Sequence, residues 1–350
     1  MTADSVTVVI GGVTYTGTLA AQTPPVSYAR PAGNTGSGLY VAGGRLNNPD
    51  ATEARLRGVN RCHQDSNSAA GLIKAGVNAV RIFVSTIWDN QTPAGLASLV
   101  QTQHVANKQV PIVTAPYVSG TTASQVATSG DTSSADLATV AALWVSQAPS
   151  WLPVVNPCGI VNIANEWGPT DSVAWQSANI AAVATLRKAG YLCPLLIDAG
   201  GYGQDAAGLL AYAAGVLAAD PQKNVLFGFH AYGGTTVANV SAQFASFSAL
   251  AAQGVCVVIS EFGPGENVGP SPTMVTPQQI ITAAESNSLG WLPWAWDDNN
   301  EAGGATSPTG WFGMTLTGPG IYTQLSDLTA FGQLMVPYWG SLAKPLAVFG

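Results

Sequence analysis

The chain has 350 residues, a formal net charge of −7 at pH 7 and only 9% charged side chains, against about 25% in an average soluble domain. With 12 Lys and Arg residues it has no basic cluster to neutralise phosphates, which argues against a nucleic-acid partner, and no apolar run approaches the ~20 residues of a membrane-spanning helix. A surface made mainly of neutral polar side chains favours an extracellular enzyme that acts on a neutral polymer.

The N-terminal region is predicted to be separate from the main domain. No basic region precedes an apolar stretch, so we expect no signal peptide; the protein is then either cytoplasmic or a mature secreted segment with an added Met, and we favour the second. Residues 5–18 alternate around a Gly-Gly pair, which predicts a β-hairpin, and 23–38 is rich in Pro, Gly, Asn and Ser, as in a linker or an extended segment. We therefore divide the chain into a hairpin and linker at 1–36 and a main domain at 37–350.

The main domain begins with a second short hairpin at 39–46 and then alternates strand-like and helix-like segments. The strands are apolar throughout, and eight of them, each followed by a helix or long loop, predict a closed (β/α)8 barrel rather than an open sheet. Candidate strands lie near 57–62, 78–85, 110–115, 160–165, 194–199, 224–230, 255–260 and 291–296. Candidate helices include 136–147, 172–189, 206–219 and 277–288, and a Ser-, Thr- and Gly-rich loop is expected at 119–134.

Two glutamates occupy matching positions at predicted strand ends. Glu166 and Glu261 each follow a β-branched apolar run and precede a Gly-containing turn, in a chain that has only six glutamates. The carboxyl ends of barrel strands converge at one mouth, so the two carboxylates are expected to face each other. Such a pair, about 5–5.5 Å apart, serves a retaining glycosidase: one carboxyl protonates the departing oxygen and the other attacks the anomeric carbon. We assign Glu166 as the acid/base and Glu261 as the nucleophile.

The neighbours of Glu166 fit supporting roles. Asn165 is placed to hydrogen-bond a sugar 2-hydroxyl in the transition state. Trp167, or a nearby carboxylate charge, is expected to help Glu166 keep its proton. His230 is expected to orient Glu166 or a substrate hydroxyl.

A second group is expected around Glu261. Arg81 and Tyr232 are the cation and the hydroxyl that would keep Glu261 ionised, although an arginine in a barrel strand can equally be a structural ion-pair partner. Trp296 offers a flat apolar face for stacking a pyranose ring, with burial in the core as the alternative.

Other polar residues are left open or assigned to the surface. His63 follows the first strand and is either a binding-cleft residue or a structural one. His104, in a helix expected at 96–107, is predicted to lie on the surface. Asn60 and Asp198 stand at strand ends without an assigned role. The remaining glutamates lack a strand-end position and are expected to be solvated or in loops: Glu53, Glu266, Glu285 and Glu301.

The four cysteines have no metal-ligand spacing. Cys158 and Cys193 both precede predicted strands that would be neighbours at the barrel floor, so a disulfide between them and two small buried thiols are both open. Cys62 and Cys256 are interpreted as buried hydrophobes. The sequence predicts no metal site and no cofactor.

Taken jointly, these residues resemble glycoside hydrolase family 5, a family of retaining (β/α)8-barrel enzymes. The resemblance implies the acid/base and the nucleophile assigned above, with the other residues in their supporting roles. The motifs that carry it are Val-Arg81-Ile, Asn165-Glu166, His230-Ala-Tyr232, Ser-Glu261-Phe-Gly and Pro-Trp-Ala-Trp296.

Within that family the chain is most similar to bacterial endo-β-mannanases, over about residues 37–335. One shared stretch, Leu196-Ile-Asp-Ala-Gly-Gly-Tyr-Gly-Gln204-Asp, adds Gln204 to the substrate-binding candidates. The resemblance implies an endo-acting enzyme that cleaves internal β-1,4-mannosidic bonds with retention and uses no cofactor. Its partner would be β-mannan or a related β-1,4-linked polysaccharide, and the enzyme would be a monomer.

One departure from the family pattern bears on substrate identity. Such enzymes usually have a histidine at the end of strand three, near the sugar in the −1 subsite, whereas this chain reads Val113-Thr-Ala-Pro-Tyr117. Tyr117, the 119–134 loop or His63 is expected to fill that space. The acidic stretch 297–301 either binds substrate hydroxyls or faces solvent.

Several alternatives to a β-mannanase are weighed. An endo-β-1,4-glucanase, or an exo-β-mannosidase with long loops closing one end of the cleft, would use the same two glutamates. A non-catalytic sugar-binding barrel would be expected to lack one of the glutamates, and both are present. An isomerase or aldolase barrel would need a metal cluster, a Schiff-base lysine or a phosphate loop at a strand end, and the sequence shows none.

Overall fold

The structure is a computed structural model of the whole chain. It describes residues 5–10, 13–18, 27–61, 69–84, 90–114, 134–264, 275–297, 312–316, 322–342 and 349. His63, Cys62 and Tyr117 lie outside the described residues, as do the 119–133 part of the predicted loop, the 298–301 part of the acidic stretch, Glu266 and Glu301.

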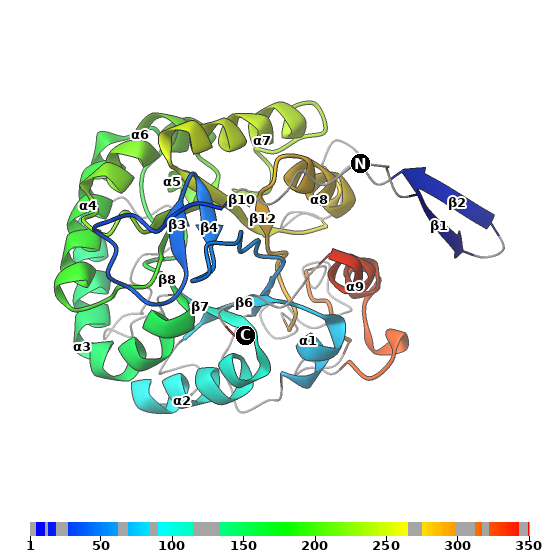
Figure 1. Cartoon of the computed structure of the whole chain (residues 1–350), viewed down its shortest axis with the longest axis horizontal. Helices are drawn as coiled ribbons and strands as arrows, with labels where there is room; N and C mark the ends of the chain where they lie inside the picture. Colours follow the sequence, from blue (N-terminus) through cyan, green and yellow to red (C-terminus); the bar gives the residue numbers. More distant parts are fainter. Residues whose placement is uncertain are drawn as a thin grey trace.

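Eight parallel strands form the centre of the molecule, in chain order around one sheet (Figure 1). The sheet closes on itself: Arg57 bridges Trp291, and the Gly58 N–H donates to the Trp291 carbonyl at 3.0 Å. This confirms the predicted (β/α)8 barrel. The strands are β5 (Val59–Arg61), β6 (Ala79–Phe83), β7 (Val110–Thr114), β8 (Ile160–Asn162), β9 (Leu195–Asp198), β10 (Val225–Ala231), β11 (Cys256–Phe262) and β12 (Gly290–Trp291).

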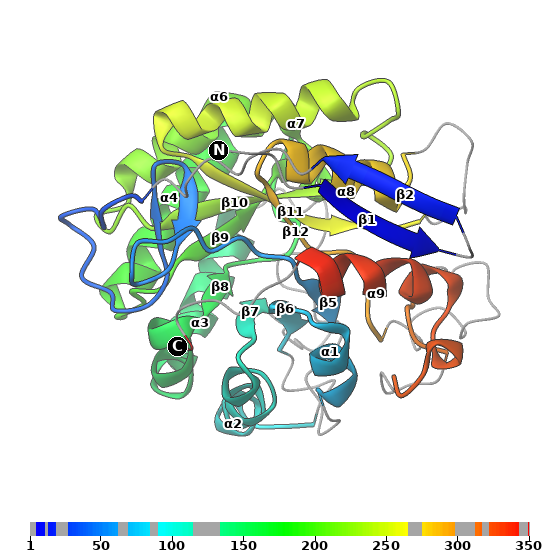
Figure 2. The same ribbon diagram turned by 45° about the vertical axis from the view of Figure 1, so that its right-hand side comes forward.

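Helices surround the strands, as Figures 1 and 2 show. They are α1 (Ala70–Ala75), α2 (Pro93–Gln103), α3 (Ser134–Cys158), α4 (Val173–Lys188), α5 (Gly200–Gly203), α6 (Ala206–Ala219), α7 (Val240–Ala249), α8 (Pro277–Ser286) and α9 (Ala330–Leu342). The prediction for 206–219 is confirmed in full, and those for 172–189 and 277–288 are confirmed to within two residues at each end. Among the described residues, no helix is both long enough and apolar enough to cross a membrane.

Two predicted elements differ in length from the observed ones. Helix α3 continues past 147 through three internal prolines, which ordinarily break a helix, because its inner face is anchored by Trp144 and Trp151, both fully buried. The last strand was predicted over 291–296 but has only two residues. Beyond Trp291 the backbone bonds alternately to its two neighbours, since Trp294 N donates to the Phe262 carbonyl and Trp296 N to the Asn60 carbonyl.

The strands alternate between two hydrophobic cores. Ile112, Leu196 and Leu226 point into the barrel, while Val80 and Ile82 pack against the helices. Burial of each such side chain stabilises the fold by about 1.5–3 kcal/mol relative to exposure. At the carboxyl ends of the strands the side chains that point into the barrel are polar instead of apolar, and these polar side chains form the candidate site.

Both predicted hairpins are confirmed. β1 (Ser5–Ile10) pairs antiparallel with β2 (Val13–Thr18), and β3 (Tyr40–Ala42) pairs with β4 (Arg45–Asn47). The β3–β4 hairpin lies across the amino-terminal end of the barrel, which faces the viewer in Figure 1. Its buried Val41 and Leu46 belong to the inner core, and Val41 N donates to Asn224 Oδ1 at 2.9 Å. The floor of the barrel is therefore plugged, and the opposite end carries the site.

The structure corrects the surface assignment of His104. Helix α2 ends at Gln103 rather than continuing to 107, and His104 caps it with an N–H bond to the Val100 carbonyl, on the face that buries Leu96 and Val100, so the ring is fully buried. Its Nδ1 lies 2.9 Å from Gln109 Oε1. Burial lowers the pKa of His104 to about 4, which leaves the ring neutral at physiological pH.

Glu285 is also not a solvated residue. It accepts two hydrogen bonds from Arg57, at 2.6 and 2.8 Å, and one from Trp291 Nε1 at 2.8 Å. Burial disfavours its charge, but Arg57 outweighs that effect and the pKa of Glu285 is lowered. Glu53 is half-buried and pairs with Arg55 at 2.7 Å. Cys158, Cys193 and Cys256 are buried free thiols, so the structure has no bridge between Cys158 and Cys193.

Candidate active site

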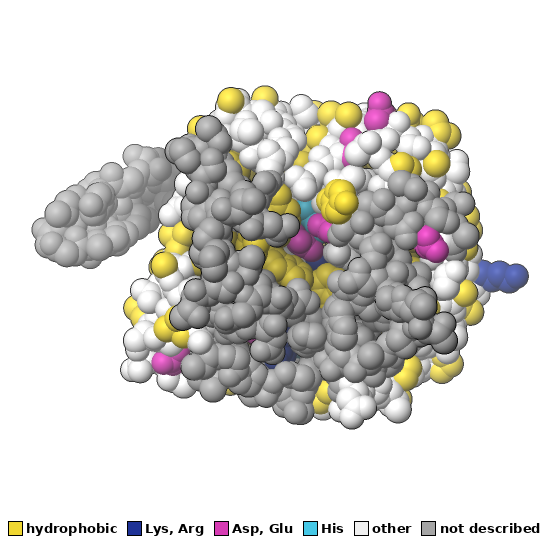
Figure 3. Space-filling model, turned by 180° about the vertical axis from the view of Figure 1, so that it is seen from behind, with side chains coloured by type: hydrophobic (Ala, Val, Ile, Leu, Met, Phe, Trp, Pro, Cys, Tyr) yellow, Lys and Arg dark blue, Asp and Glu magenta, His cyan; other side chains and the backbone are white. Residues whose placement is uncertain are grey.

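The predicted site residues converge at the carboxyl-terminal end of the barrel. Figure 3 views the molecule from this side and shows acidic side chains and a histidine together in a hollow of the surface. Glu166 follows β8, and its carboxylate Oε1 lies 2.7 Å from His230 Nδ1. Its backbone has φ +53°, in the left-handed region that a side chain rarely adopts, and its N–H donates to Asp198 Oδ2 at 3.1 Å. Such strain is characteristic of functional positions.

Glu261 reaches the mouth because β11 contains a bulge. The pairing of β10 with β11 shifts between Phe229 and His230, so that one residue of β11, Ser260, has no partner. Ser260 already faces the barrel interior, and strict alternation would turn Glu261 outward towards the helices. The extra residue restores the inward direction and places Glu261 opposite His230.

Three groups hold the Glu261 carboxylate. Arg81 Nη1 donates to Oε1 at 2.5 Å, and the Tyr232 hydroxyl donates to Oε2 at 3.1 Å. His230 Nδ1 lies 3.4 Å from Oε2. The structure thus places Arg81 and Tyr232 beside Glu261, as the sequence predicted.

Arg81 is wholly buried and bonds to five side chains, so it is both a structural partner and a ligand of Glu261. It also contacts Asn165, whose Oδ1 accepts from Nη2 at 2.7 Å. This bond fixes the orientation of the half-buried Asn165 amide beside Glu166. The remaining partners of Arg81 are Asn60, Asn162 and Asp198.

The charges of the site displace several pKa values. Burial raises the pKa of Glu261, with further contributions in the same direction from Glu166 and Asp198, against Arg81 and His230. Burial alone would lower the pKa of His230, but Glu261 and Asp198 outweigh it and raise that pKa to about 10. Burial also raises the pKa of the Tyr232 hydroxyl well above its usual value, so Tyr232 remains a hydrogen-bond donor. Perturbed groups of this kind cluster at functional sites.

Burial bears on two aromatic predictions. Trp296 is only 2% exposed and packs against Trp339 and Tyr322, so it lies in the core, which was the alternative to stacking on a sugar. Trp167 is equally buried, which excludes direct contact with a substrate but not a role beneath Glu166. Trp294, two residues before Trp296, is half-buried and packs edge-on against Phe83 with ring centroids 5.5 Å apart. The two tryptophans of Pro-Trp-Ala-Trp indicated an aromatic side chain at this strand end, but their spacing alone does not tell which of the two rings is the more exposed.

Two further polar residues, Asp198 and Gln204, have defined contacts in the structure. Asp198 was left without a role, yet its carboxylate contacts Arg81, His230 and the Glu166 backbone. Gln204 lies on the rim, where its Oε1 accepts from the Gly234 N–H at 3.2 Å.

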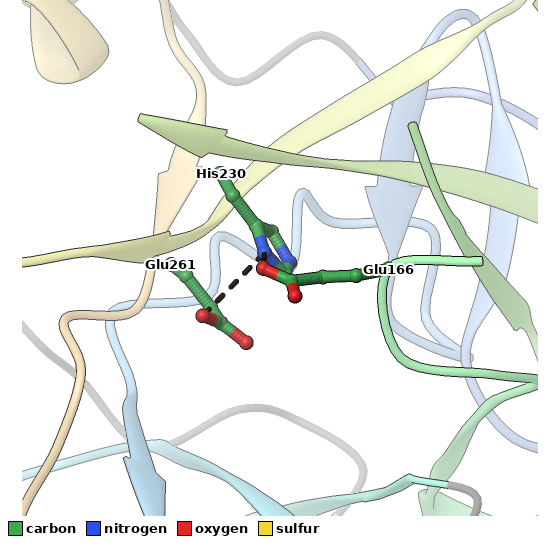
Figure 4. A group of neighbouring side chains, drawn as sticks. All are labelled: Glu166, His230 and Glu261. Atoms are coloured by element: carbon green, nitrogen blue, oxygen red, sulfur yellow. Dashed lines mark hydrogen bonds and ion pairs between the residues drawn. The ribbon is translucent and has the colours of Figure 1, made fainter. Parts of the chain in front are cut away.

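The central three side chains also have the compactness of a metal site. One ligand-type atom of each of Glu166, His230 and Glu261 lies within 4.8 Å of the others, and Figure 4 shows the ring of His230 beside both carboxylates. In this chain, however, the Glu261 carboxylate already accepts hydrogen bonds from Arg81 and Tyr232, and His230 Nδ1 is directed at the Glu166 carboxylate. Charge-assisted hydrogen bonds of this kind favour proton transfer, and we do not assign these residues as metal ligands.

Known proteins share both the sequence and the fold. The mannan endo-1,4-β-mannosidase of Streptomyces lividans is 28% identical over 273 residues, which cover 75% of this chain and 67% of that protein. The mannan endo-1,4-β-mannosidase of Salipaludibacillus agaradhaerens is 28% identical over 275 residues, 75% of this chain and 83% of that protein. The crystal structure of a β-mannanase from Streptomyces thermolilacinus superposes with a TM-score of 0.70 at 29% identity, over 89% of this chain and all of the other.

The same β-mannanase has also been solved with mannohexaose, and that structure gives a TM-score of 0.69 at 29% identity, over 90% of this chain and 99% of the other. The family described as cellulase (glycosyl hydrolase family 5) matches residues 48–300, which include every described side chain of the catalytic cluster. The chain therefore belongs to glycoside hydrolase family 5, and it is a glycoside hydrolase.

Proposed function

We propose that the protein is a secreted, monomeric, endo-acting β-mannanase that hydrolyses internal β-1,4-mannosidic bonds with retention of configuration. The observation that carries the mechanism is the approach of Glu166 and Glu261, whose nearest carboxylate oxygens lie within 4.8 Å. Retaining enzymes have carboxyl groups about 5–5.5 Å apart, whereas inverting enzymes leave about 6.5–9.5 Å for a water molecule. The relatives named above support mannan as the substrate.

In the first step of the proposed mechanism, each glutamate has a different task. Glu261, held by Arg81 and Tyr232, attacks the anomeric carbon and forms a glycosyl–enzyme bond. Glu166 gives its proton to the glycosidic oxygen, and the bond from that oxygen to the anomeric carbon breaks. The leaving chain departs with a free hydroxyl, and Glu166 becomes a carboxylate that accepts a hydrogen bond from His230 Nδ1.

In the second step, Glu166 acts as a base. Its carboxylate takes a proton from water, whose oxygen attacks the anomeric carbon, and the bond to Glu261 breaks. Glu261 returns to its carboxylate form and Glu166 to its acid form. Two inversions at one carbon give net retention.

The proposal is tested by the products formed from mannan, glucomannan, galactomannan and cellulose. We expect rapid release of mixed oligosaccharides from mannan, and ¹H NMR of the first product should show the β-anomer before mutarotation. Release of mannose alone would contradict endo action, and an α-anomer would contradict retention.

An endo-β-1,4-glucanase is the second candidate. A protein named β-mannanase/endoglucanase A, from Caldicellulosiruptor saccharolyticus, is 28% identical over 143 residues, which cover 40% of this chain and 10% of that protein. Hydrolysis of cellulose at a rate comparable to that of mannan would favour this assignment.

A further inference from the structure

Asp198 lies directly behind both catalytic glutamates. It is the last residue of β9 and is only 2% exposed. Its Oδ2 is 3.1 Å from Arg81 Nη2, 3.1 Å from the Glu166 backbone nitrogen and 3.5 Å from His230 Nε2. This one carboxylate oxygen therefore accepts hydrogen bonds from Arg81 on β6 and from Glu166 beyond β8, and it lies at ion-pair distance from His230 on β10.

Each of these donors serves a catalytic carboxylate on its other side. Arg81 holds Glu261 at 2.5 Å, and His230 holds Glu166 at 2.7 Å through the opposite ring nitrogen. The third contact fixes the strained backbone of Glu166 itself. Asp198 touches neither the anomeric carbon nor the glycosidic oxygen, so any effect it has on catalysis passes through these partners.

The surrounding backbone is shaped to accept this arrangement. A Cβ at Gly228 would lie 2.4 Å from Asp198 Oδ1, and a Cβ at Gly203 would lie 2.4 Å from His230 Cγ. Glycine at these two positions lets the carboxylate fit inside the barrel and lets the backbone press against the imidazole ring. The ring is thus confined by Gly203 on one side, with Asp198 at Nε2 and Glu166 at Nδ1.

We propose that Asp198 is a positioning residue that keeps His230 as an imidazolium, with Nε2–H directed at Asp198 and Nδ1–H directed at Glu166. This inference rests on the proposed acid/base role of Glu166. A charged His230 has no lone pair to compete for the Glu166 proton, so that proton goes to the glycosidic oxygen. The Nδ1–H then stabilises the Glu166 carboxylate that remains.

The charges that face His230 support this state. Glu166 approaches from beyond β8, Asp198 from β9 and Glu261 from β11, while Arg81 on β6 is the opposing cation and Tyr232 is uncharged. Three carboxylates face one guanidinium among these groups, so a second positive charge is favoured despite burial. The raised pKa of His230, about 10, agrees with this count.

The charge of His230 can be measured directly by NMR on ¹⁵N-histidine-labelled protein, without any substrate. The chain has three histidines, so single variants of His63 and His104 assign the signals. We expect both His230 nitrogens to stay protonated at pH 7 and above. His104, with a pKa of about 4, is the internal control for a neutral ring at that pH. A neutral His230 at pH 7 would overturn the proposal, whatever the substrate of the enzyme proves to be.

The variant Asp198→Asn tests the consequence for catalysis. We expect kcat on mannan to fall by about 10- to 100-fold, the scale seen for partners that orient a functional histidine at one remove, with little change in KM. Without the carboxylate, the pKa of His230 should fall, so a new ionisation should appear on the alkaline side of the kcat–pH profile and in the NMR titration, below the pKa of about 10 of the wild-type ring.

Asp220→Asn is the matched control. Asp220 is an equally buried aspartate that pairs with Arg187 far from the mouth, and its variant should leave the kcat–pH profile unchanged. An Asp198→Asn profile that keeps the shape of the wild-type profile would refute the proposal. If Asp198→Asn does not fold, the NMR titration of the wild-type protein still decides it. Failure to cleave mannan would count against the proposed function instead, because the NMR result does not depend on the substrate.

Discussion

Each end of the barrel contains an arginine whose side chain is buried, and the two arginines differ in the number of carboxylates around them. At the floor, Arg187 meets the single carboxylate of Asp220 through two bonds, at 3.0 and 2.9 Å. Its other N–H groups donate to backbone carbonyls, and Asp220 also accepts from the backbone of Gln222 and Asn224. One arginine therefore pairs with one carboxylate, and backbone groups satisfy the remaining donors of Arg187 and the remaining acceptors of Asp220.

At the mouth, Arg81 is shared. It bonds to Glu261 and Asp198, and a third carboxylate, Glu166, lies close by. The excess negative charge is met by His230, and several pKa values are displaced as a result. The comparison teaches that burial of an arginine–carboxylate pair does not itself indicate function. A buried group in which the carboxylates outnumber the cations, as at the mouth, does indicate a functional site.

The largest expected effect comes from removing Glu261, the proposed nucleophile. Glu261→Ala should lower kcat/KM on mannan by about 10⁵- to 10⁶-fold, the scale of losing a nucleophile elsewhere. The free energy of unfolding should hold or rise, because one of the crowded carboxylates is gone. Hydrolysis assays and urea unfolding check both parts. Residual activity near the wild-type rate would show that the nucleophile is a different residue.

Removing the acid should have a smaller and more selective effect. Glu166→Gln should slow hydrolysis of mannan by about 10²- to 10⁴-fold, the usual contribution of general acid–base catalysis. An aryl β-mannoside with a good leaving group needs no proton in the first step, so formation of its glycosyl–enzyme should be largely spared. Pre-steady-state release of the aryl group measures this step. Equal losses on both substrates would be inconsistent with an acid role.

The Arg187–Asp220 pair at the floor should show the reverse pattern, in which a variant loses stability but keeps its activity. Arg187→Ala leaves Asp220 buried without its cation, which typically costs about 3–5 kcal/mol of unfolding free energy. The kcat of the folded fraction should be unchanged, because Arg187 has no contact with the mouth. Urea denaturation and an activity assay below the unfolding transition separate the two effects. A large loss of kcat in folded protein would break the contrast between the two ends.

The smallest effect is a displacement of the pH profile. Because burial raises the pKa of Glu261, its carboxylate takes up a proton as the pH falls through that raised value, and a protonated Glu261 cannot attack. The acidic limb of kcat/KM for wild-type enzyme should therefore lie above the ordinary glutamate value of about 4.3. Arg81→Lys, whose single ammonium group cannot keep all the partners of Arg81, should weaken the contact with Glu261 and move the limb further upward. A limb below the ordinary value would contradict the assigned direction.

Sequence reasoning went furthest where function depends on residue type at a strand end. The fold followed from eight apolar segments separated by helical ones. Glu166, His230 and Tyr232 followed from their places at the ends of those segments, and Arg81 from its place within one. The structure brings these side chains together because parallel strands in a closed barrel all deliver their carboxyl ends to one mouth. The convergence is a property of the topology and requires no knowledge of side-chain contacts.

Burial of individual side chains was less predictable. His104 was assigned to the surface, although it follows Leu96 and Val100 at helical spacing on the buried face of α2. Trp296 was assigned to the sugar, yet Trp294 is the less buried of the two rings. For His104 the spacing was a usable signal, whereas the spacing of the two tryptophans does not tell which ring the rest of the fold covers.

The sequence alone therefore determined the barrel, the two glutamates and the cation and hydroxyl that attend Glu261. Only the tertiary structure decided that Ser260 is an extra residue in β11, so that Glu261 faces inward although alternation would turn it outward. It also decided that Asp198 stands behind both glutamates. The physical reason is that a bulge and a shared buried charge are set by pairing between strands far apart in the chain, and no single strand encodes either one.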